Sequence, residues 1–151
     1  MDLHETSLRL KVLASKKPND EYRNEVLKAL SSKHEGIGVC AAKTLSAWGD
    51  SKSVEDLRTT LNRIAKREAR WAATGAISKE LYPHLKEIDV PWATELILRI
   101  SNRNNRFTLF GMLLRLPVQK VLEQLDREEI VGGVDPDEVQ NARHLLKRNI
   151  T

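Results

Sequence analysis

Apolar residues recur along this chain at intervals of three and four, the spacing that places side chains on one face of an α-helix. The pattern is clearest between residues 34 and 66, where two apolar runs flank a short break at residues 48–50. The first run contains Val39, Ala42, Leu45 and Trp48, and the second contains Val54, Leu57, Leu61 and Ile64. Each run predicts one amphipathic helix, and the short break between them predicts a helical hairpin.

The break has the chemistry of a helix end followed directly by a helix start. Gly49 can adopt the left-handed conformation that ends many helices. Asp50 or Ser53 can cap the free N–H groups of the next helix, and Ser53 and Asp56 come close to a capping box. The sequence leaves open which residue is the cap.

The rest of the chain repeats this alternation of amphipathic runs and breaks. Further helices are expected at residues 3–16, 19–32, 71–80, 92–103, 107–114, 117–125 and 135–146. The run that begins at residue 107 has apolar positions at Phe107, Phe110, Leu113 and Leu114. No alternating run is long enough to predict a strand. We therefore predict a single all-α domain, residues 1–151, of about four helix pairs plus a C-terminal helix.

Two of the predicted helices share a doublet of alanines. Aligning residues 41–42 with residues 72–73 places two copies of a helix pair 31 residues apart. A period of roughly 20–50 residues is typical of stacked units that cannot each close a core alone. Gly75 lies inside the second copy, where glycine costs about 1 kcal/mol relative to alanine. Its alternative role is to let a neighbouring helix approach closely.

Residues 41–61, AAKTLSAWGDSKSVEDLRTTL, resemble a HEAT-type repeat of the short variety found in phycobilin-lyase-like proteins. The matching residues are Ala41, Ala42, Leu45, Gly49, Asp50, Val54, Leu57 and Leu61. The resemblance implies an armadillo-type fold, a right-handed α-α superhelix of antiparallel helix pairs. It does not imply lyase activity, because such repeats serve many unrelated roles.

The charge of the chain is moderately basic, with a net charge of +4 and a pI near 9.3. Residues 36–106 account for the whole excess, with twelve Lys or Arg against eight Asp or Glu. This distribution favours an acidic partner without identifying one. No apolar run approaches the roughly 20 residues of a bilayer span, and the N-terminus lacks the features of a secretory signal. We expect a cytoplasmic protein without a membrane partner.

Residue types that carry catalysis or bind metals are scattered along the sequence. The four histidines, at positions 4, 34, 84 and 144, form no i, i+4 pair, and no basic residue is placed to activate the single cysteine, Cys40. The sequence contains no phosphate-binding loop, no G-x-S-x-G and no H-E-x-x-H motif. We therefore expect no catalytic residue, no metal site and no cofactor.

The second helix of each pair usually lines the concave surface that meets partners in helical stacks. Opposite the apolar stripes of the two central second helices, the sequence places polar and basic residues and one leucine. These candidate partner-binding residues are Thr59, Asn62, Arg63, Lys66, Glu95, Leu98, Arg99, Asn102 and Arg103. Such a face suits an acidic segment of another protein, with Leu98 as an apolar contact. The simpler alternative is a solvated face, with Leu98 packed under the C-terminal helix.

Nucleic-acid binding is the second hypothesis. Basic residues cluster at Arg58, Arg63, Lys66, Arg67 and Arg70 with Glu68 among them, and again at Arg99, Arg103 and Arg106. Such groups suit phosphates, and Trp71 or Trp92 could stack on a base if exposed. Some DNA glycosylases use HEAT-like repeats, but only Glu95 beside Trp92 hints at their catalytic carboxylate. We therefore expect a non-catalytic adaptor, scaffold or regulator that binds another protein, with nucleic-acid binding as the alternative.

Overall fold

A computed structural model of the chain describes residues 2–67 and 71–149. In these ranges all regular structure is helical, and nine helices pack against one another. They are α1 (Leu3–Ala14), α2 (Asp20–Leu30), α3 (Glu35–Trp48), α4 (Ser51–Ala65), α5 (Trp71–Leu81), α6 (Val90–Glu95), α7 (Arg103–Leu113), α8 (Val118–Val131) and α9 (Pro136–Arg148). Two 3-10 turns, η2 (Tyr82–His84) and η3 (Glu87–Asp89), precede α6, and a π-helical turn, η4 (Leu96–Ile100), follows it. The all-α prediction is confirmed.

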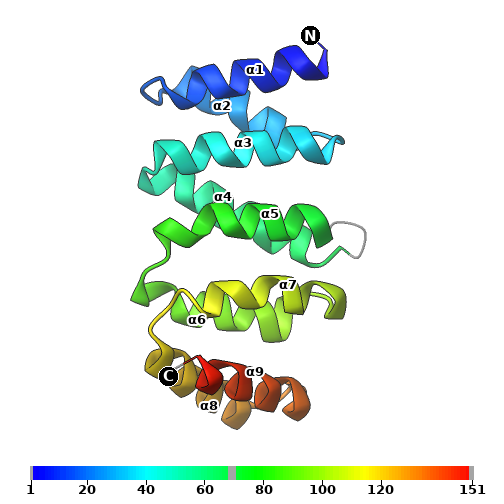
Figure 1. Cartoon of the computed structure of the whole chain (residues 1–151), viewed down its shortest axis with the longest axis vertical. Coiled ribbons are helices and arrows are strands. Elements are labelled where there is room, and N and C mark those ends of the chain that lie inside the picture. The colour runs from blue at the N-terminus through cyan, green and yellow to red at the C-terminus, as the bar shows by residue number, and fades with distance from the viewer. Residues whose placement is uncertain (1, 68–70, 150–151) are drawn as a thin grey trace.

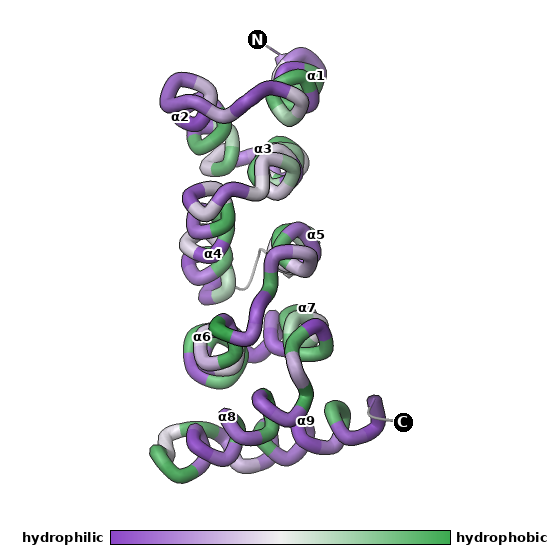
Figure 2. The backbone as a smooth tube through the Cα atoms, turned by 90° about the vertical axis from the view of Figure 1, so that its left-hand side faces the viewer, coloured by the Kyte–Doolittle hydropathy of each residue, from purple (hydrophilic) through white to green (hydrophobic). Residues whose placement is uncertain are grey.

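The helices are stacked in two layers along one long axis, with the N-terminus at one end (Figure 1). The first helices of the pairs, α1, α3, α5 and α7, lie in one layer, and α2, α4 and α6 lie in the other (Figure 2). Within the first layer, α1 packs on α3, α3 on α5, and α5 on α7. The last two helices, α8 and α9, run in a different direction from the first helices of the pairs. Figure 2 shows α8 and α9 lengthwise, whereas α1, α3, α5 and α7 are seen nearly end-on.

Equivalent buried residues recur every 32 positions in the first helices. They are Leu13, Leu45, Ile77 and Leu109, none more than 2% exposed. A spacing of 31 pairs the buried Ala41 with the exposed Ala72, whereas 32 pairs Ala41 with the buried Ala73. The expected period is therefore wrong by one residue for these helices. Alanine misled the alignment because it is small enough to occupy either an interface or an exposed helix position.

The turn between α3 and α4 is only partly as predicted. Gly49 ends α3 in the left-handed conformation, with φ of 65°, which confirms its expected role. Asp50 immediately precedes α4, but its side chain makes no capping hydrogen bond. Ser53 lies within the first turn of α4 and donates its hydroxyl hydrogen to the carboxylate of Asp50. Ser53 and Asp56 therefore form no capping box, because α4 begins at Ser51 and Ser53 is already inside the helix.

Gly75 sets the distance between α5 and α7. A Cβ atom added at Gly75 would lie 2.7 Å from Cγ2 of Thr108 in α7, closer than real Cβ contacts allow. The absence of a side chain thus permits the close packing of these two helices. Of the two roles considered for Gly75, the structure supports close approach.

Candidate functional site

The predicted face on α4 is largely at the surface. Thr59, Arg63 and Lys66 are exposed, on the side of α4 opposite its buried residues. Asn62 is half-buried, because its Oδ1 accepts a hydrogen bond from Nε1 of Trp92 at 3.1 Å. On α6, Glu95 is exposed. The hydrogen bond between Asn62 and Trp92 connects α4 with α6.

Leu98 is not the exposed contact that we expected, because it is only 5% exposed. It lies in η4, where the amide of Ser101 donates to the carbonyl of Leu96 at 2.8 Å, five residues back. A π-turn has more residues per turn than an α-helix, so a spacing of 3.6 misplaces side chains within it. η4 packs against α4 and α7, and the preceding α6 packs against α8. Leu98 lines a groove that residues of α7 and α9 also line.

Arg99 and Asn102 have structural partners. The guanidinium of Arg99 pairs with the carboxylate of Glu128 and donates to the carbonyls of Glu128 (3.2 Å) and Gly132 (3.0 Å) at the end of α8. Asn102 caps α7, because its side chain accepts a hydrogen bond from the amide of Asn105 at 3.1 Å. By contrast, Arg103 in the first turn of α7 is exposed and has no ion pair with any described residue.

Arg58 and Trp92 are engaged with each other and with their neighbours. Arg58 pairs with Asp89 at 2.7 Å, and its guanidinium lies 5.9 Å from the ring centroid of Trp92. The indole N–H of Trp92 is bound to Asn62. Arg58 is therefore not free for a phosphate, and Trp92 is not a free stacking surface. Glu68, Arg70 and the side chain of Trp71 lie outside the described residues.

A buried arginine is the main residue that the sequence interpretation missed. Arg23 of α2 is 7% exposed, and its guanidinium lies 5.6 Å from the ring centroid of Trp48. It donates to Oδ2 of Asp50 at 2.8 Å and to Oγ of Ser53 at 2.7 Å, at the start of α4. Its three-residue spacing from the buried Val26 already indicated that it points inward.

The two carboxyl groups near Arg23 are shifted in opposite directions. Burial opposes ionisation of Asp50, but hydrogen bonds from Ser53 and Arg23 outweigh it and lower the pKa of Asp50. Burial raises the pKa of Asp56, and the charge of Arg23, 3.9 Å away, opposes this only in part. Asp50 is thus the principal counter-ion of Arg23.

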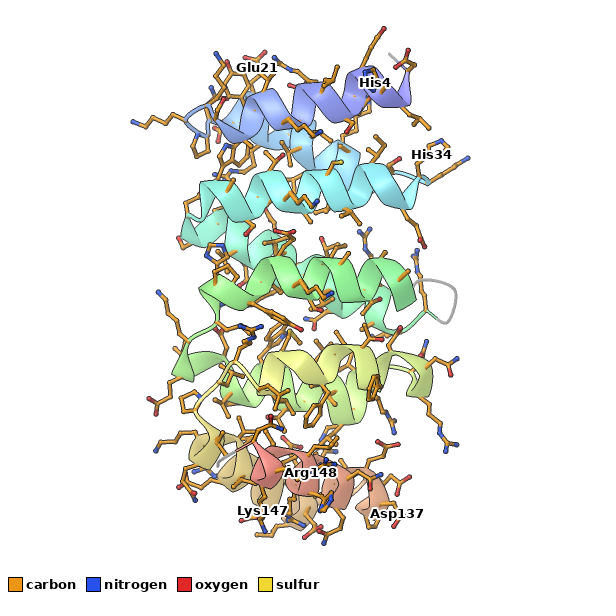
Figure 3. The ribbon with its side chains drawn as sticks, in the orientation of Figure 1. His4, Glu21, His34, Asp137, Lys147 and Arg148 are labelled. Carbon is orange, nitrogen blue, oxygen red and sulfur yellow. The ribbon has the colours of Figure 1, made fainter. Side chains whose placement is uncertain are left out.

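An apolar groove of about 370 Å³ lies between η4, α7 and α9. We call it the α7–α9 groove, and it is lined by Ile97, Leu98, Arg103, Arg106, Phe107, Phe110, Glu138, Asn141, Ala142, His144 and Leu145. It exists because α9 packs mainly against α8 and crosses below α7 instead of lying along it (Figure 2). Figure 3 shows Asp137 at the start of α9, with Lys147 and Arg148 near its end.

Phe107 stands at the rim of this groove and is 86% exposed. The sequence pattern had assigned it to the inward stripe of its helix, together with Leu114, which is 42% exposed. That assignment is wrong for both residues, because only Leu109, Met112 and Leu113 of the apolar residues in α7 are fully covered by the stack. A helical pattern marks an apolar face but does not show whether another helix covers it.

The charges of the groove are only partly neutralised within the described chain. Arg106 pairs with Glu138 at 3.4 Å, and its Nε is buried without a hydrogen-bond acceptor. Arg103 remains unpaired at the same end of α7. With two arginines and one glutamate in its lining, the groove carries a formal charge of +1 when His144 is neutral.

Ser46 and His84 are within hydrogen-bond distance of each other but do not form a nucleophile and base. The hydroxyl of Ser46 donates to the carbonyl of Glu80 at 2.8 Å. Nε2 of His84 lies 3.0 Å from the carbonyl of Ser46 and 3.1 Å from its hydroxyl. Since carbonyl oxygens only accept, Nε2 carries the hydrogen and cannot remove one from Ser46. The pair holds η2 against α3.

Other chemistry-bearing residues are dispersed. Cys40 is half-buried, with its Sγ 3.4 Å from the hydroxyl of Ser7. Within the described ranges, no group of three or more His, Cys, Asp or Glu side chains could hold a metal ion. None of the helices found there is long and apolar enough to traverse a bilayer. No protein-family model matches the chain, and neither a curated protein nor a solved structure matches it.

Proposed function

We propose that the protein is a non-catalytic module that binds another protein, as an adaptor, scaffold or regulator, and that its helix pairs form a right-handed superhelix of HEAT-like repeats. The recurrence of buried residues every 32 positions and the layered stacking support the repeat. The Gly49 turn between α3 and α4 agrees with it. The sequence-based expectation of a cytoplasmic protein belongs to the same proposal.

The observation that carries the binding proposal is the exposure of Phe107 beside the α7–α9 groove. A phenylalanine that is 86% exposed leaves a large apolar area in water, at a cost of about 25 cal/mol per Å² that burial would recover. Exposed apolar surface next to a groove is typical of interaction sites. Leu98 and Arg103, two of the predicted partner-binding residues, line this groove. The binding site is therefore expected on the side of η4 that faces α9.

The test is affinity capture from an extract of the source organism with three forms of the protein. They are the wild type, Phe107→Ser in the groove, and Arg63→Glu on the exposed side of α4 as a matched surface control. We expect proteins, identified by mass spectrometry, that bind the wild type and the Arg63 variant but not the Phe107 variant. The proposal would be contradicted if Phe107→Ser captured the same proteins as the wild type, or if the captured proteins were lost when nucleic acid is digested.

A further inference from the structure

We propose that the α7–α9 groove binds an amphipathic helix of the partner protein, with an acidic residue next to its apolar face that pairs with Arg103. This inference rests on the proposed function and adds the chemistry of the partner. It follows from the apolar lining of the groove, from the position of its unpaired charge and from the occupants that this charge disfavours.

The apolar lining of the groove suits one face of a helix. Its floor contains the buried Leu98 and Ala142, and its rim contains Phe107. α7 has 11 residues, so its length is about 16 Å at 1.5 Å per residue. A partner helix of similar length presents apolar side chains at positions i, i+4 and i+7 on one face, which is how helices bind apolar grooves. The helix would bury the ring of Phe107.

The charge of the groove selects an acidic partner. Glu138 already neutralises Arg106, whereas Arg103 is exposed and unpaired among the described residues. Arg103 also lies in the first turn of α7, where the helix dipole adds positive potential. A carboxylate placed there gains a charge-assisted hydrogen bond, which is stronger than one between neutral groups. A lysine beside Arg103 would be repelled by its charge.

The same charge disfavours a second copy of this chain as the occupant. A two-fold contact through the groove would bring the same surface of both subunits together. The positively charged lining of one groove would then face the same lining of the other, while Glu138 of each copy is engaged with its own Arg106. Like charges facing each other across an interface oppose association.

The experiment uses a displayed library of 16-residue helical peptides with apolar residues at i, i+4 and i+7 and random residues at the flanking positions. It is selected on the wild type, Arg103→Glu, Arg103→Gln and Phe107→Ser. All three substitutions change exposed side chains, and circular dichroism confirms that each variant is folded. Analytical ultracentrifugation of the unliganded protein shows whether it forms dimers.

We expect the wild type to enrich Asp or Glu at one flanking position, and Arg103→Glu to enrich Lys or Arg there. Arg103→Gln should show neither preference, and Phe107→Ser should enrich no peptide. A selected acidic peptide should bind the wild type at least about tenfold more tightly than Arg103→Glu, which corresponds to roughly 1.4 kcal/mol. Sedimentation should show a monomer.

Three results would overturn the inference. They are enrichment without an acidic preference, an acidic preference that persists in Arg103→Glu, and dimers that Phe107→Ser abolishes. If protein capture still requires Phe107 while selected peptides lack an acidic preference, the proposed function stands and only the partner's chemistry is wrong. If neither capture nor peptide enrichment depends on Phe107, the proposed function itself is wrong.

Discussion

Single side chains determine how closely the first helices of neighbouring pairs approach one another. Gly75 in α5 faces Thr108 in α7 with no room for a Cβ atom, whereas a Cβ at Gly36 in α3 would meet nothing within 4 Å. Both glycines lie in helices, where alanine is intrinsically favoured by about 1 kcal/mol. The two positions therefore separate the effect of helix propensity from the effect of packing.

Gly75→Ala should lower the free energy of unfolding by about 1 kcal/mol, because overpacking costs about 1–3 kcal/mol and exceeds the gain in propensity. Gly36→Ala, the matched control, should leave stability unchanged or raise it by up to about 1 kcal/mol. Adding Thr108→Ser removes Cγ2 and should restore the stability of Gly75→Ala, as measured by urea denaturation. A stabilising effect of Gly75→Ala alone would show that α5 and α7 are less closely packed than described.

The Arg23 cluster leads to a pH-dependent prediction. The pKa of Asp50 is lowered in the folded chain, so its ionised form stabilises the fold above the unfolded pKa, and this contribution is lost as pH falls through the folded pKa. Asp50→Asn should therefore cost about 1–3 kcal/mol at pH 7, because Arg23 loses its principal counter-ion. In thermal melts, the difference in stability between Asp50→Asn and the wild type should become smaller below about pH 4.

Asp56→Asn is the control for this prediction, since the raised pKa of Asp56 means that burial penalises its charge. It should not destabilise the protein at pH 7 and should slightly stabilise it. Equal losses from both substitutions would mean that Asp50 and Asp56 share the neutralisation of Arg23.

At the scale of elements, the apolar periodicity correctly predicted a succession of helices, but it continued one helix from residue 92 to residue 103, whereas α7 begins at Arg103. It also missed the π-turn η4. The turn depends on contacts with a distant segment, because the amide of Asn102, just after it, donates to the carbonyl of Ala65 at 3.0 Å. The hydroxyl of Ser101 also donates to the carbonyl of Ile97 at 2.9 Å. A local pattern contains no information about a hydrogen bond to the end of α4. Leu98 was misplaced for this reason.

Asn105 makes the same connection from within α7. It is fully buried, and its Nδ2 donates to the carbonyls of Ala65 (2.7 Å) and Arg67 (3.2 Å) at the end of α4. Asn105→Ala should lower stability by about 1–3 kcal/mol, because it removes both hydrogen bonds from this buried side chain to the end of α4. Hydrogen exchange should quicken at the C-terminal end of α4.

The adjacent and exposed Asn104 provides the control, and Asn104→Ala should change stability by no more than about 0.5 kcal/mol. If both alanine variants behave alike in melts and in hydrogen exchange, Asn105 does not join α4 to α7.

At the scale of the whole molecule, the sequence indicated the candidate site only in part. Leu98 and Arg103 were singled out and do line the α7–α9 groove, but for reasons that concerned a different face. The groove itself depends on the direction in which α9 crosses α7 (Figure 2). That angle is set by the packing of α9 against α8, a contact between two helices, whereas periodicity describes one helix at a time.

Ion pairs within the molecule reduce the number of basic residues that are available to an external ligand. Arg23, Arg58 and Arg99 are paired with carboxylates inside or between helices. Arg63, Lys66 and Arg67 remain exposed, near the end of α4, without an ion pair to a described residue. This patch is the remaining support for nucleic-acid binding, and it is small beside the roughly 6–10 phosphate contacts of a strongly salt-dependent binder.

We therefore expect weak binding to random duplex or single-stranded DNA at physiological salt. Fluorescence anisotropy should show that the affinity for DNA falls only slightly as salt rises from about 50 to 200 mM. The double variant Arg63→Glu/Lys66→Glu reverses exposed charges without touching the core, so it should leave protein capture intact. The opposite result would be micromolar binding whose affinity falls steeply with salt, with a slope of log affinity against log salt concentration that the double variant reduces by about two. That result would identify phosphates as the ligand of α4. If Phe107→Ser still bound DNA in this way, DNA binding would not involve the α7–α9 groove. A protein partner that contacts the apolar rim depends on Phe107, whereas binding of phosphates to α4 does not.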